Sequence, residues 1–592
     1  MEKSYWSTVL ARRQLTRRRL LGGAVGVAAG GAALSLIGCG GGGDDGVAND
    51  ASGLLGKPED TTKNAKASGT WPSHFTEDII NMDVLLNNAT PTFPQLNPVY
   101  SNLLKGGMST KERPGPETIT GDAAESWELA PDGRQITLKL RQNMKFDPRP
   151  PTSGRAMTSE DVKWSWDKFE GFGPSARDLS YKRSDVSPIE SVQTPDARTV
   201  VFKFAFPYTP IIELLSSHQH FYIEPRDENF NFKGDMRGSG PYFLESFRPS
   251  QGITYNKNPD WYDKPRPYFD KIERTLISDY SNGLAQFKAK NLWAFGVRPE
   301  DILQTKRDNP DMLMFAGLEY DTGVSYTNFS KRPDSIFADV RMRRAVSMML
   351  ERDLLSDVFF NLSPFKDAGL PTEYRWNSHI PAGYAEWVDP RSTAIGEGAK
   401  YFQHNPAEAR KLVQAAGVPI PVKETYASWT DRAFDQVKQH EVIMAMINEG
   451  GTFALDWRPL IYNTTWRTED DSGGEAYTGL LSSRLAGFSV DVYVVQKYTP
   501  EGRSKVANKA LPGITDLVVK QRQEPDFKKR AEIIKQLQQN AALEWYDIPF
   551  PPGNFPGYSL RWPWLANHGV FVTNNASAKE YVHYWYDESK KI

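Results

Sequence analysis

The 592-residue sequence contains a single cysteine, Cys39. One cysteine excludes an internal disulfide, and it excludes a cysteine-based metal cluster or a Cys–His redox pair in the folded body. Three motifs of catalytic or phosphate-binding proteins are also absent: the Gly-x-Ser-x-Gly elbow, the His-Glu-x-x-His zinc helix and the Gly-x-x-x-x-Gly-Lys-Ser/Thr loop. His440 and Glu441 begin the zinc pattern, but Met444 stands where the second histidine is required. These absences predict a protein that is not an enzyme and that holds no cofactor.

The sequence also lacks an excess of positive charge. Six of its 71 Lys and Arg residues and one of its 73 Asp and Glu residues precede Cys39, so the rest carries 65 positive against 72 negative side chains. Nucleic-acid-binding proteins need a basic surface, so this balance argues against such a partner. The 39% hydrophobic and 24% charged residues are typical of a globular protein.

An export-type pattern precedes the cysteine. Arg17, Arg18 and Arg19 stand before an uncharged stretch, residues 20–38, that is rich in Gly and Ala. This layout resembles an export signal of the twin-arginine type, and the final Leu-Ile-Gly-Cys resembles a bacterial lipobox. The resemblance implies that Cys39 carries a lipid that holds the protein at the outer side of the cell membrane. The alternative is a permanent transmembrane anchor.

Residues 40–72 are rich in Gly, Asp, Ser, Thr and Lys and offer little apolar surface. We therefore predict that they form a flexible tether between the anchor and a globular body.

Period-two and period-3.6 patterns alternate along the body, which predicts a mixed α/β fold. Ile136, Leu138 and Leu140 alternate with polar residues, as in a half-buried strand. Thr158 followed by Asp161 favours a helix that begins with a capping box. Length alone suggests two or more lobes.

Five stretches in order resemble the extracellular solute-binding proteins of family 5, which are the peptide-, nickel- and solute-binding components of ABC importers. The stretches are residues 123–169, residues 238–262, residues 328–353, residues 405–417 and residues 526–549. The resemblance implies the two-lobed periplasmic-binding-protein-like fold (type II, cluster C), with an extra subdomain in lobe one and a hinge between the lobes.

The same resemblance implies a division of the chain. We predict an export signal with lipobox in 1–39, the tether in 40–72, lobe one in 73–320, lobe two in 321–548 and a C-terminal return to lobe one in 549–592. The ligand is expected between the lobes, and the chain is expected to be a monomer that works with ABC permease subunits of the membrane.

In this family an aspartate in a Gly-Trp-x-x-Asp pattern often holds the amino terminus of a bound peptide. The matching residues here are Gly487, Phe488 and Asp491, with Phe in place of Trp. A carboxylate that faces an ammonium forms a strong charge-assisted hydrogen bond, so Asp491 is the predicted anchor. The alternative is that Asp491 lies on the surface or caps a helix.

Further ligand-binding candidates follow from their places in the family pattern. They are Tyr326 and Asn328 at the first predicted crossing, Arg484 near the aspartate, and Trp429, Trp457 and Trp466 in lobe two. Each residue type is more often found in a core or on a surface than against a ligand.

The ligand class stays open at this point. A peptide is the commonest ligand of the family, but an oligosaccharide or a nickel complex is an alternative, and so is a receptor without a transport role. His218 and His220 would present two rings on one side of a strand, yet a metal site needs further ligands. We therefore predict no metal site.

Overall fold

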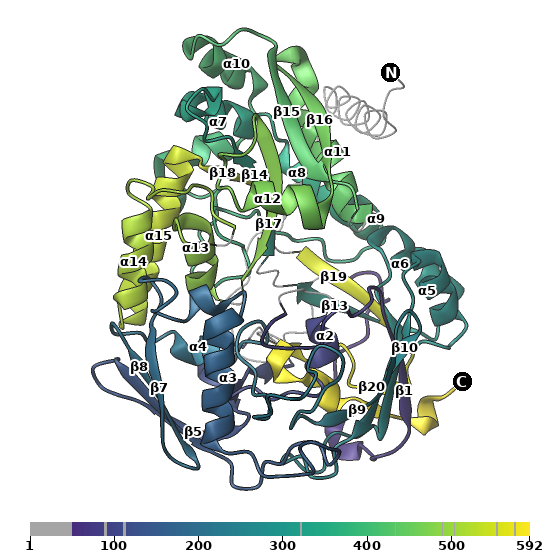
Figure 1. Cartoon of the computed structure of the whole chain (residues 1–592). Helices are drawn as coiled ribbons and strands as arrows, with labels where there is room; N and C mark the ends of the chain where they lie inside the picture. The colour runs from purple at the N-terminus through teal and green to yellow at the C-terminus, as the bar shows by residue number, and fades with distance from the viewer. Residues whose placement is uncertain are drawn as a thin grey trace, which may run out of the picture.

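The computed structural model describes residues 50–87, 92–110, 114–319, 323–431, 434–487, 489–502, 504–551, 555–573 and 576–592. Cys39 and the predicted export signal lie outside these ranges. Figure 1 shows two lobes. We call residues 50–319 and 555–592 lobe one, and residues 323–551 lobe two. Within the described residues, no helix is long and apolar enough to cross a membrane.

Lobe one is built on three main sheets. The first contains β1 (Thr70–Phe75), β11 (Lys271–Leu276), β10 (Gly252–Lys257) and β9 (Tyr242–Arg248), in that order. The second contains β5 (Ala124–Leu129), β6 (Gln135–Leu140), β8 (Thr199–Phe204) and β7 (Ile189–Asp196). The third contains β12 (Ala294–Phe295), β19 (Phe555–Arg561) and β13 (Leu313–Glu319). Because β19 pairs with β13 in register Arg561 to Leu313, the C-terminal part of the chain completes lobe one.

Short strand pairs and five helices complete lobe one. The pairs are β2 (Leu104–Lys105) with β4 (Thr120–Gly121), β3 (Met108–Ser109) with β21 (Val572–Thr573), and β20 (Leu565–Ala566) with β22 (Trp585–Tyr586). The helices are α2 (Phe93–Leu96), α3 (Ser159–Phe172), α4 (Ile211–Leu215), α5 (Tyr280–Lys288) and α6 (Pro299–Asp308).

Lobe two contains a five-stranded sheet. Its order is β16 (Phe453–Leu460), β15 (Val422–Trp429), β17 (Leu480–Ala486), β14 (Gly323–Phe329) and β18 (Asp547–Pro549). Its helices are α7 (Val340–Met348), α8 (Arg352–Phe360), α9 (Leu362–Asp367), α10 (Pro406–Ala415), α11 (Phe434–Asn448), α12 (Arg467–Asp470), α13 (Val490–Tyr498), α14 (Thr515–Gln523) and α15 (Phe527–Glu544). The predicted mixed α/β, two-lobed architecture is thus observed.

Local sequence signals place several of these elements. The predicted strand is β6, and the predicted helix is α3, where Thr158 and Asp161 form the capping box in full. Helix α10 begins at an Asn405 cap and is followed by Gly417, whose φ of 73° is the left-handed conformation that glycine tolerates. The predicted final helix is α15, with Asp526 as its cap.

The tether prediction needs a correction for the part of it that the structure describes. Residues 70–72 lie inside β1, which pairs in parallel with β11. Upstream of it, Leu55 bridges Met314 and the Ala51 amide donates to the Gly369 carbonyl. Residues 50–72 are therefore packed on the body, because their few apolar side chains and backbone groups find partners that the composition does not reveal.

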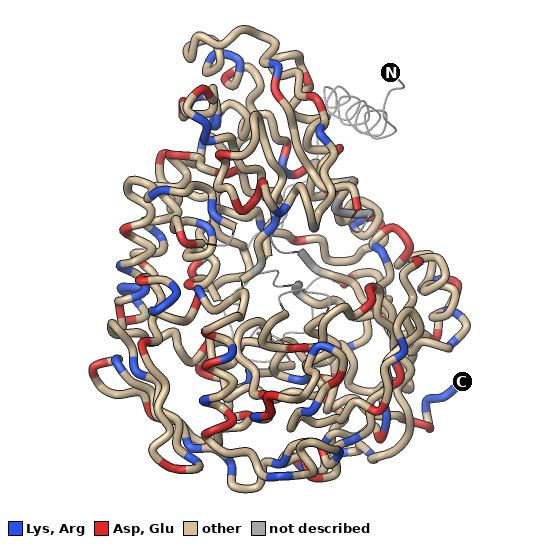
Figure 2. Tube along the Cα trace, in the orientation of Figure 1, with Lys and Arg blue, Asp and Glu red and all other residues tan. Residues whose placement is uncertain are grey.

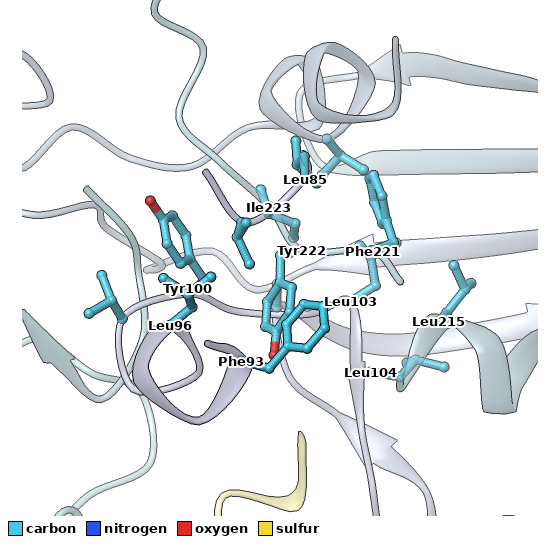
Figure 3. Close-up of a cluster of buried hydrophobic side chains, with 14 of the residues drawn as sticks. Leu85, Phe93, Leu96, Tyr100, Leu103, Leu104, Leu215, Phe221, Tyr222 and Ile223 are labelled. Atoms are coloured by element: carbon cyan, nitrogen blue, oxygen red, sulfur yellow. The ribbon is translucent and has the colours of Figure 1, made fainter. Parts of the chain in front are cut away.

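The largest core lies in lobe one. Figure 3 shows part of it, with Tyr100, Phe221 and Tyr222 among leucines that come from segments far apart in the sequence. Lobe two has two main cores, one on each side of its sheet. Figure 2 shows positive and negative residues interspersed over both lobes, in keeping with the charge balance of the sequence.

One buried titratable side chain in lobe one, Glu224, is expected to make the free energy of unfolding depend on pH. Lys168 Nζ lies 2.8 Å from Asp83 and 2.5 Å from Glu224, whose side chain is fully buried. Burial raises the pKa of Glu224 to about 8, against the opposing effect of Lys168. Because the folded state binds this proton more tightly than the unfolded state, its stabilising contribution is complete below pH 4.5 and is lost as the pH rises through about 8.

Glu224→Gln is therefore expected to flatten the fall in stability between pH 5 and pH 9, because glutamine imitates the protonated acid at every pH. Urea unfolding at several pH values measures the effect. Glu245→Gln is the control, because Glu245 forms a partly exposed pair with Lys271 at 3.0 Å and its pKa is lowered. Equal pH profiles for wild type and Glu224→Gln would show that Glu224 is ionised in the folded protein.

Candidate ligand-binding edge of lobe two

Three strands of the lobe-two sheet end at one edge. Strand β15 runs parallel to both β16 and β17, so the carboxyl ends of all three strands lie together. The start of β14 is there too, because Gly323 pairs with Ala486. Ligands of open α/β sheets bind outside the carboxyl ends of strands. Figure 1 shows this edge directed towards lobe one, where the chain passes between the lobes.

Two of the predicted tryptophans meet at this edge. Trp429, the last residue of β15, stands edge-on to Trp466 with ring centroids 4.9 Å apart. Tyr462 stacks on Trp466 at 4.6 Å. Trp466 donates to the Ser482 carbonyl at 2.7 Å, whereas the buried Trp429 indole N–H has no partner among the described residues. The aromatic cluster therefore has one polar group available for a ligand or a water.

His440 supports this cluster from α11. Its ring stands edge-on to Trp429 at 4.6 Å, and Nδ1 lies 2.9 Å from the Ser482 hydroxyl. Burial lowers the pKa of His440 to about 3, so the ring is neutral at physiological pH. Its role here is packing, and within the described residues no three His, Cys, Asp or Glu side chains are grouped to hold a metal.

The third predicted tryptophan lies elsewhere. Trp457 is in the middle of β16, opposite Tyr426, and 43% of it is exposed. Its indole donates to the Ser428 hydroxyl at 2.9 Å. It belongs to the sheet but not to the aromatic cluster.

The two predicted residues of β14 lie on the same face of the sheet as Leu481 and Ala427, because Asn328 pairs with Leu481 and Leu481 pairs with Ala427. Tyr326 is completely buried, donates to the Ser504 carbonyl at 3.1 Å and has the Lys497 ammonium 4.4 Å from its ring. Asn328 is 3% exposed, and its amide oxygen has no partner among the described residues. Both lie on the strand that follows the first passage between the lobes.

Arg484 and Gly487 lie at the end of β17. Arg484 is exposed and stands opposite Ser325, whose hydroxyl is 3.5 Å from Nη1. The Gly487 carbonyl accepts from Tyr384 at 2.6 Å, and a Cβ at this position would lie 2.9 Å from the tyrosine oxygen. Close packing therefore requires glycine here. Phe488 lies outside the described residues.

Asp491, the predicted amine anchor, is in the first turn of α13 and is fully buried. One of its oxygens accepts from Gln521 at 2.6 Å and the other accepts from Tyr208 of lobe one at 2.5 Å. The Arg522 guanidinium adds bonds of 3.1 to 3.2 Å to both oxygens. Burial by itself would raise the pKa of Asp491, but the guanidinium beside it holds the pKa below its ordinary value.

These contacts join the two lobes. Arg522 also donates to two lobe-one carbonyls, those of Val186 and Asp178. A second bond runs from Gln496 of α13 to the Asp178 carboxylate at 2.7 Å. We call the side chains of Asp491, Arg522, Gln521 and Tyr208 the interlobe clasp. Anchoring of a ligand ammonium by Asp491 stays a prediction, and it would require the Arg522 guanidinium to move away.

A separate interlobe contact lies on the other side of the molecule. Phe365 of α9 packs on Tyr558 of β19 with ring centroids 4.6 Å apart. The Tyr558 hydroxyl donates to the Pro371 carbonyl. The lobes therefore touch on two sides.

The histidine pair needs a correction. His218 and His220 lie in a turn after α4 and not on a strand. His220 is buried, with Nε2 3.1 Å from Asp178 and Nδ1 3.0 Å from Ser217. His218 stands edge-on to Phe93, with ring centroids 6.1 Å apart. The His218 and His220 rings therefore contact different residues.

Sequence reasoning did not find Arg522, Gln521 and Tyr208. Tyr208 is 283 positions from Asp491, and Arg522 is 31 positions from it. An isolated arginine or tyrosine gives no signal of such a contact. The one available hint was chemical, since a buried carboxylate needs partners.

The chain resembles known proteins along most of its length. A family model described as bacterial extracellular solute-binding proteins, family 5 Middle, matches residues 118–484. An ABC transporter peptide-binding protein of Brucella ovis is 26% identical over 310 residues, covering 51% of this chain and 52% of the relative. The chain therefore spans about half the length of the curated relatives it matches.

Solved structures share the fold. The periplasmic binding protein DppA of Helicobacter pylori, in complex with the peptide STSA, superposes with a TM-score of 0.70 at 15% identity, covering 89% of this chain and 99% of that chain. AgaA of A. tumefaciens R10, in complex with agropinic acid, has a TM-score of 0.66 at 18% identity, with 88% and 99% covered.

Proposed function

Because this chain belongs to the bacterial extracellular solute-binding proteins of family 5, we propose that it captures a peptide or a related small solute between its lobes and delivers it to an ABC import permease. The observation that carries the proposal is the lobe-two edge. There three strand ends, the Trp429 cluster and Arg484 meet beside both passages of the chain between the lobes. The proposal assigns no catalytic step to this edge.

The place of the protein in the cell follows from the same proposal. A solute-binding component works outside the cytoplasm, and the pattern before Cys39 supports export and lipid attachment at that residue. We propose further that the chain crosses between the lobes near residue 320 and again after β18, which ends at Pro549, and that the protein acts as a monomer.

Peptides are favoured as ligands because the Brucella ovis relative is a peptide-binding protein by name and the Helicobacter pylori structure contains the peptide STSA. Family members of this architecture bind main-chain groups of a ligand and leave water in side-chain pockets, which permits many sequences. The alternative ligands to test are oligosaccharides, nickel complexes and acids such as the agropinic acid bound by the A. tumefaciens relative.

A short peptide at a hundredfold excess over its dissociation constant is expected to stabilise the full-length chain by about 2.7 kcal/mol, because it binds only the folded state. Thermal unfolding in the presence of peptides, oligosaccharides, nickel with chelator and agropinic acid measures this effect. Native mass spectrometry of the untreated protein detects any ligand that is already bound. A shift with oligosaccharides alone would support the importer function and would contradict a peptide as the ligand. No shift in any arm, with no bound small molecule, would favour a receptor that does not transport.

The anchoring role of Asp491 is tested with the same assay. Loss of the shift after N-acetylation of the peptide, and in Asp491→Asn, would support the anchor. Equal shifts for the free and acetylated peptides would assign Asp491 to the interlobe clasp alone.

A further inference from the structure

A second concave region lies in lobe one, away from the lobe-two edge. It has a volume of about 590 Å³, which falls within the range of small-molecule sites. We call it the Tyr262 pocket; its principal lining residues are Lys105, Trp127, Arg141, Tyr262, Asp263 and Arg266. Within the described part of the chain, their hydrogen bonds and ion pairs run to other residues of lobe one.

The aromatic wall of this pocket is held in place by a buried network. The Tyr262 hydroxyl donates to Asp122 at 3.0 Å. Asp122 is fully buried and pairs with the Lys579 ammonium, 3.2 Å away and 1% exposed. The ring is therefore fixed before any ligand arrives, and it supports the cations that lie over it.

Cations lie over this wall. The Arg141 guanidinium carbon is 4.1 Å from the centre of the Tyr262 ring, and Lys105 Nζ is 5.4 Å from it. Arg141 is partly exposed and donates to the backbone carbonyls of Asp122 and Gly121, at 2.7 and 3.2 Å. These bonds use Nε and Nη2, so they orient the guanidinium.

The acids that line the pocket are already paired. Asp263 pairs with Lys105 at 3.5 Å and with Arg266. Glu125 pairs with Arg198 at 2.7 Å. Among the residues that the structure describes, no carboxylate lies within ion-pair distance of Arg141. Three lining cations, Lys105, Arg141 and Arg266, thus share the single carboxylate of Asp263, so the pocket carries excess positive charge beside a fixed aromatic ring.

We propose that the Tyr262 pocket is a second binding site of this protein, and that it takes a small organic anion with a flat ring. The carboxylate or phosphate of such a ligand pairs with Arg141 and Lys105, since charge-assisted bonds to a guanidinium are strong and directional. The flat ring packs against Trp127, because the Arg141 guanidinium already lies against the Tyr262 ring. The site is independent of the solute that binds at the lobe-two edge.

Titration calorimetry of the full-length chain with phenyl phosphate tests the proposal. We expect saturable binding at one site, and no binding of benzyl alcohol, which has the ring without the charge. Arg141→Gln is expected to weaken binding by at least about tenfold, the loss of one charge-assisted bond. Lys105→Gln, which removes a side chain that is paired only with Asp263, is a second variant that weakens binding without touching the backbone contacts of Arg141.

Two arginine variants serve as controls. Arg134→Gln removes an exposed arginine that also donates to a backbone carbonyl, at 2.8 Å from Ala205, but lies outside the pocket. Arg484→Gln alters the lobe-two edge. Both should bind phenyl phosphate as the wild type does. Equal affinity of wild type, Arg141→Gln and Lys105→Gln, or no saturable binding, would overturn the proposal. Loss of binding in Arg484→Gln alone would place the anion at the lobe-two edge and would also overturn it.

Discussion

Replacement of Arg522 by methionine is expected to lower the free energy of unfolding by about 3–5 kcal/mol, because it leaves the Asp491 carboxylate buried without its counter-charge. Asp491 and Arg522 are 0% and 1% exposed, so water cannot replace the lost guanidinium. Urea unfolding measures the loss. The double variant Asp491→Leu/Arg522→Met should recover part of it, because both buried charges are then removed.

The matched control for this change is Arg341→Met. Arg341 also pairs with an aspartate, Asp339, but its side chain is 42% exposed. Pairs exposed to this extent contribute about 0–1 kcal/mol. If Arg522→Met costs no more than Arg341→Met, the interlobe clasp does not stabilise the fold.

The clasp variant also reports on the contact between the lobes. Tyr208 and the carbonyls of Val186 and Asp178 belong to lobe one, whereas Arg522 belongs to lobe two. Small-angle scattering of Arg522→Met is therefore expected to show a larger radius of gyration than that of the wild type. An unchanged radius would mean that the lobes are held by other contacts, such as the Phe365–Tyr558 packing on the opposite side.

The second large effect is expected from Asp547→Asn, at the first residue of β18. Lys497 Nζ lies 2.7 Å from the Asp547 carboxylate, and both side chains are completely buried. The Tyr498 hydroxyl donates to the same carboxylate at 2.9 Å. Removing the negative charge leaves the Lys497 ammonium unpaired, which is expected to cost about 3–5 kcal/mol at pH 7.

This variant carries a pH signature. Burial lowers the pKa of Lys497 from its ordinary value of 10.5, against the opposing effect of Asp547. Without Asp547 the folded-state pKa falls further below that of the unfolded chain. A depressed pKa means that stability is lost as the pH falls through the folded value, so Asp547→Asn should gain stability as the pH rises towards 10.

Asp334→Asn is the control for both observations, because the Arg332–Asp334 pair is 44% and 72% exposed. It should cost less than about 1 kcal/mol and show no gain at high pH. Unfolding in urea at pH 7 and pH 10 gives the comparison. An equal loss of stability in Asp547→Asn at pH 7 and pH 10 would show that Asp547 does not affect the pKa of Lys497, and would contradict this prediction.

The candidate site was only partly accessible to sequence reasoning. Trp429, Trp466 and Arg484 were chosen from their places in the family pattern, and only the structure shows that they lie near one edge of the sheet. The burial of Tyr326 and the exposure of Trp457 could not be predicted from the sequence. Side chains of a strand alternate between two faces, but the alternation does not show which face a helix covers. Asp491 was predicted to anchor a ligand ammonium, and this role stays a prediction; its partners in this structure are Tyr208, Gln521 and Arg522.

Sequence patterns were sufficient to predict local elements, the family and the two-lobed fold. The Thr158–Asp161 capping box, the Asn405 cap and Gly417 act over a few residues, so spacing is enough to find them. Only the folded structure shows which polar and charged side chains are buried together. Asp491 with Tyr208, Lys497 with Asp547 and Lys579 with Asp122 are 283, 50 and 457 positions apart. Separation along the sequence does not predict the distance between two side chains in space. Each of these pairs contributes to stability only in the folded protein, where the low-dielectric interior strengthens the interaction.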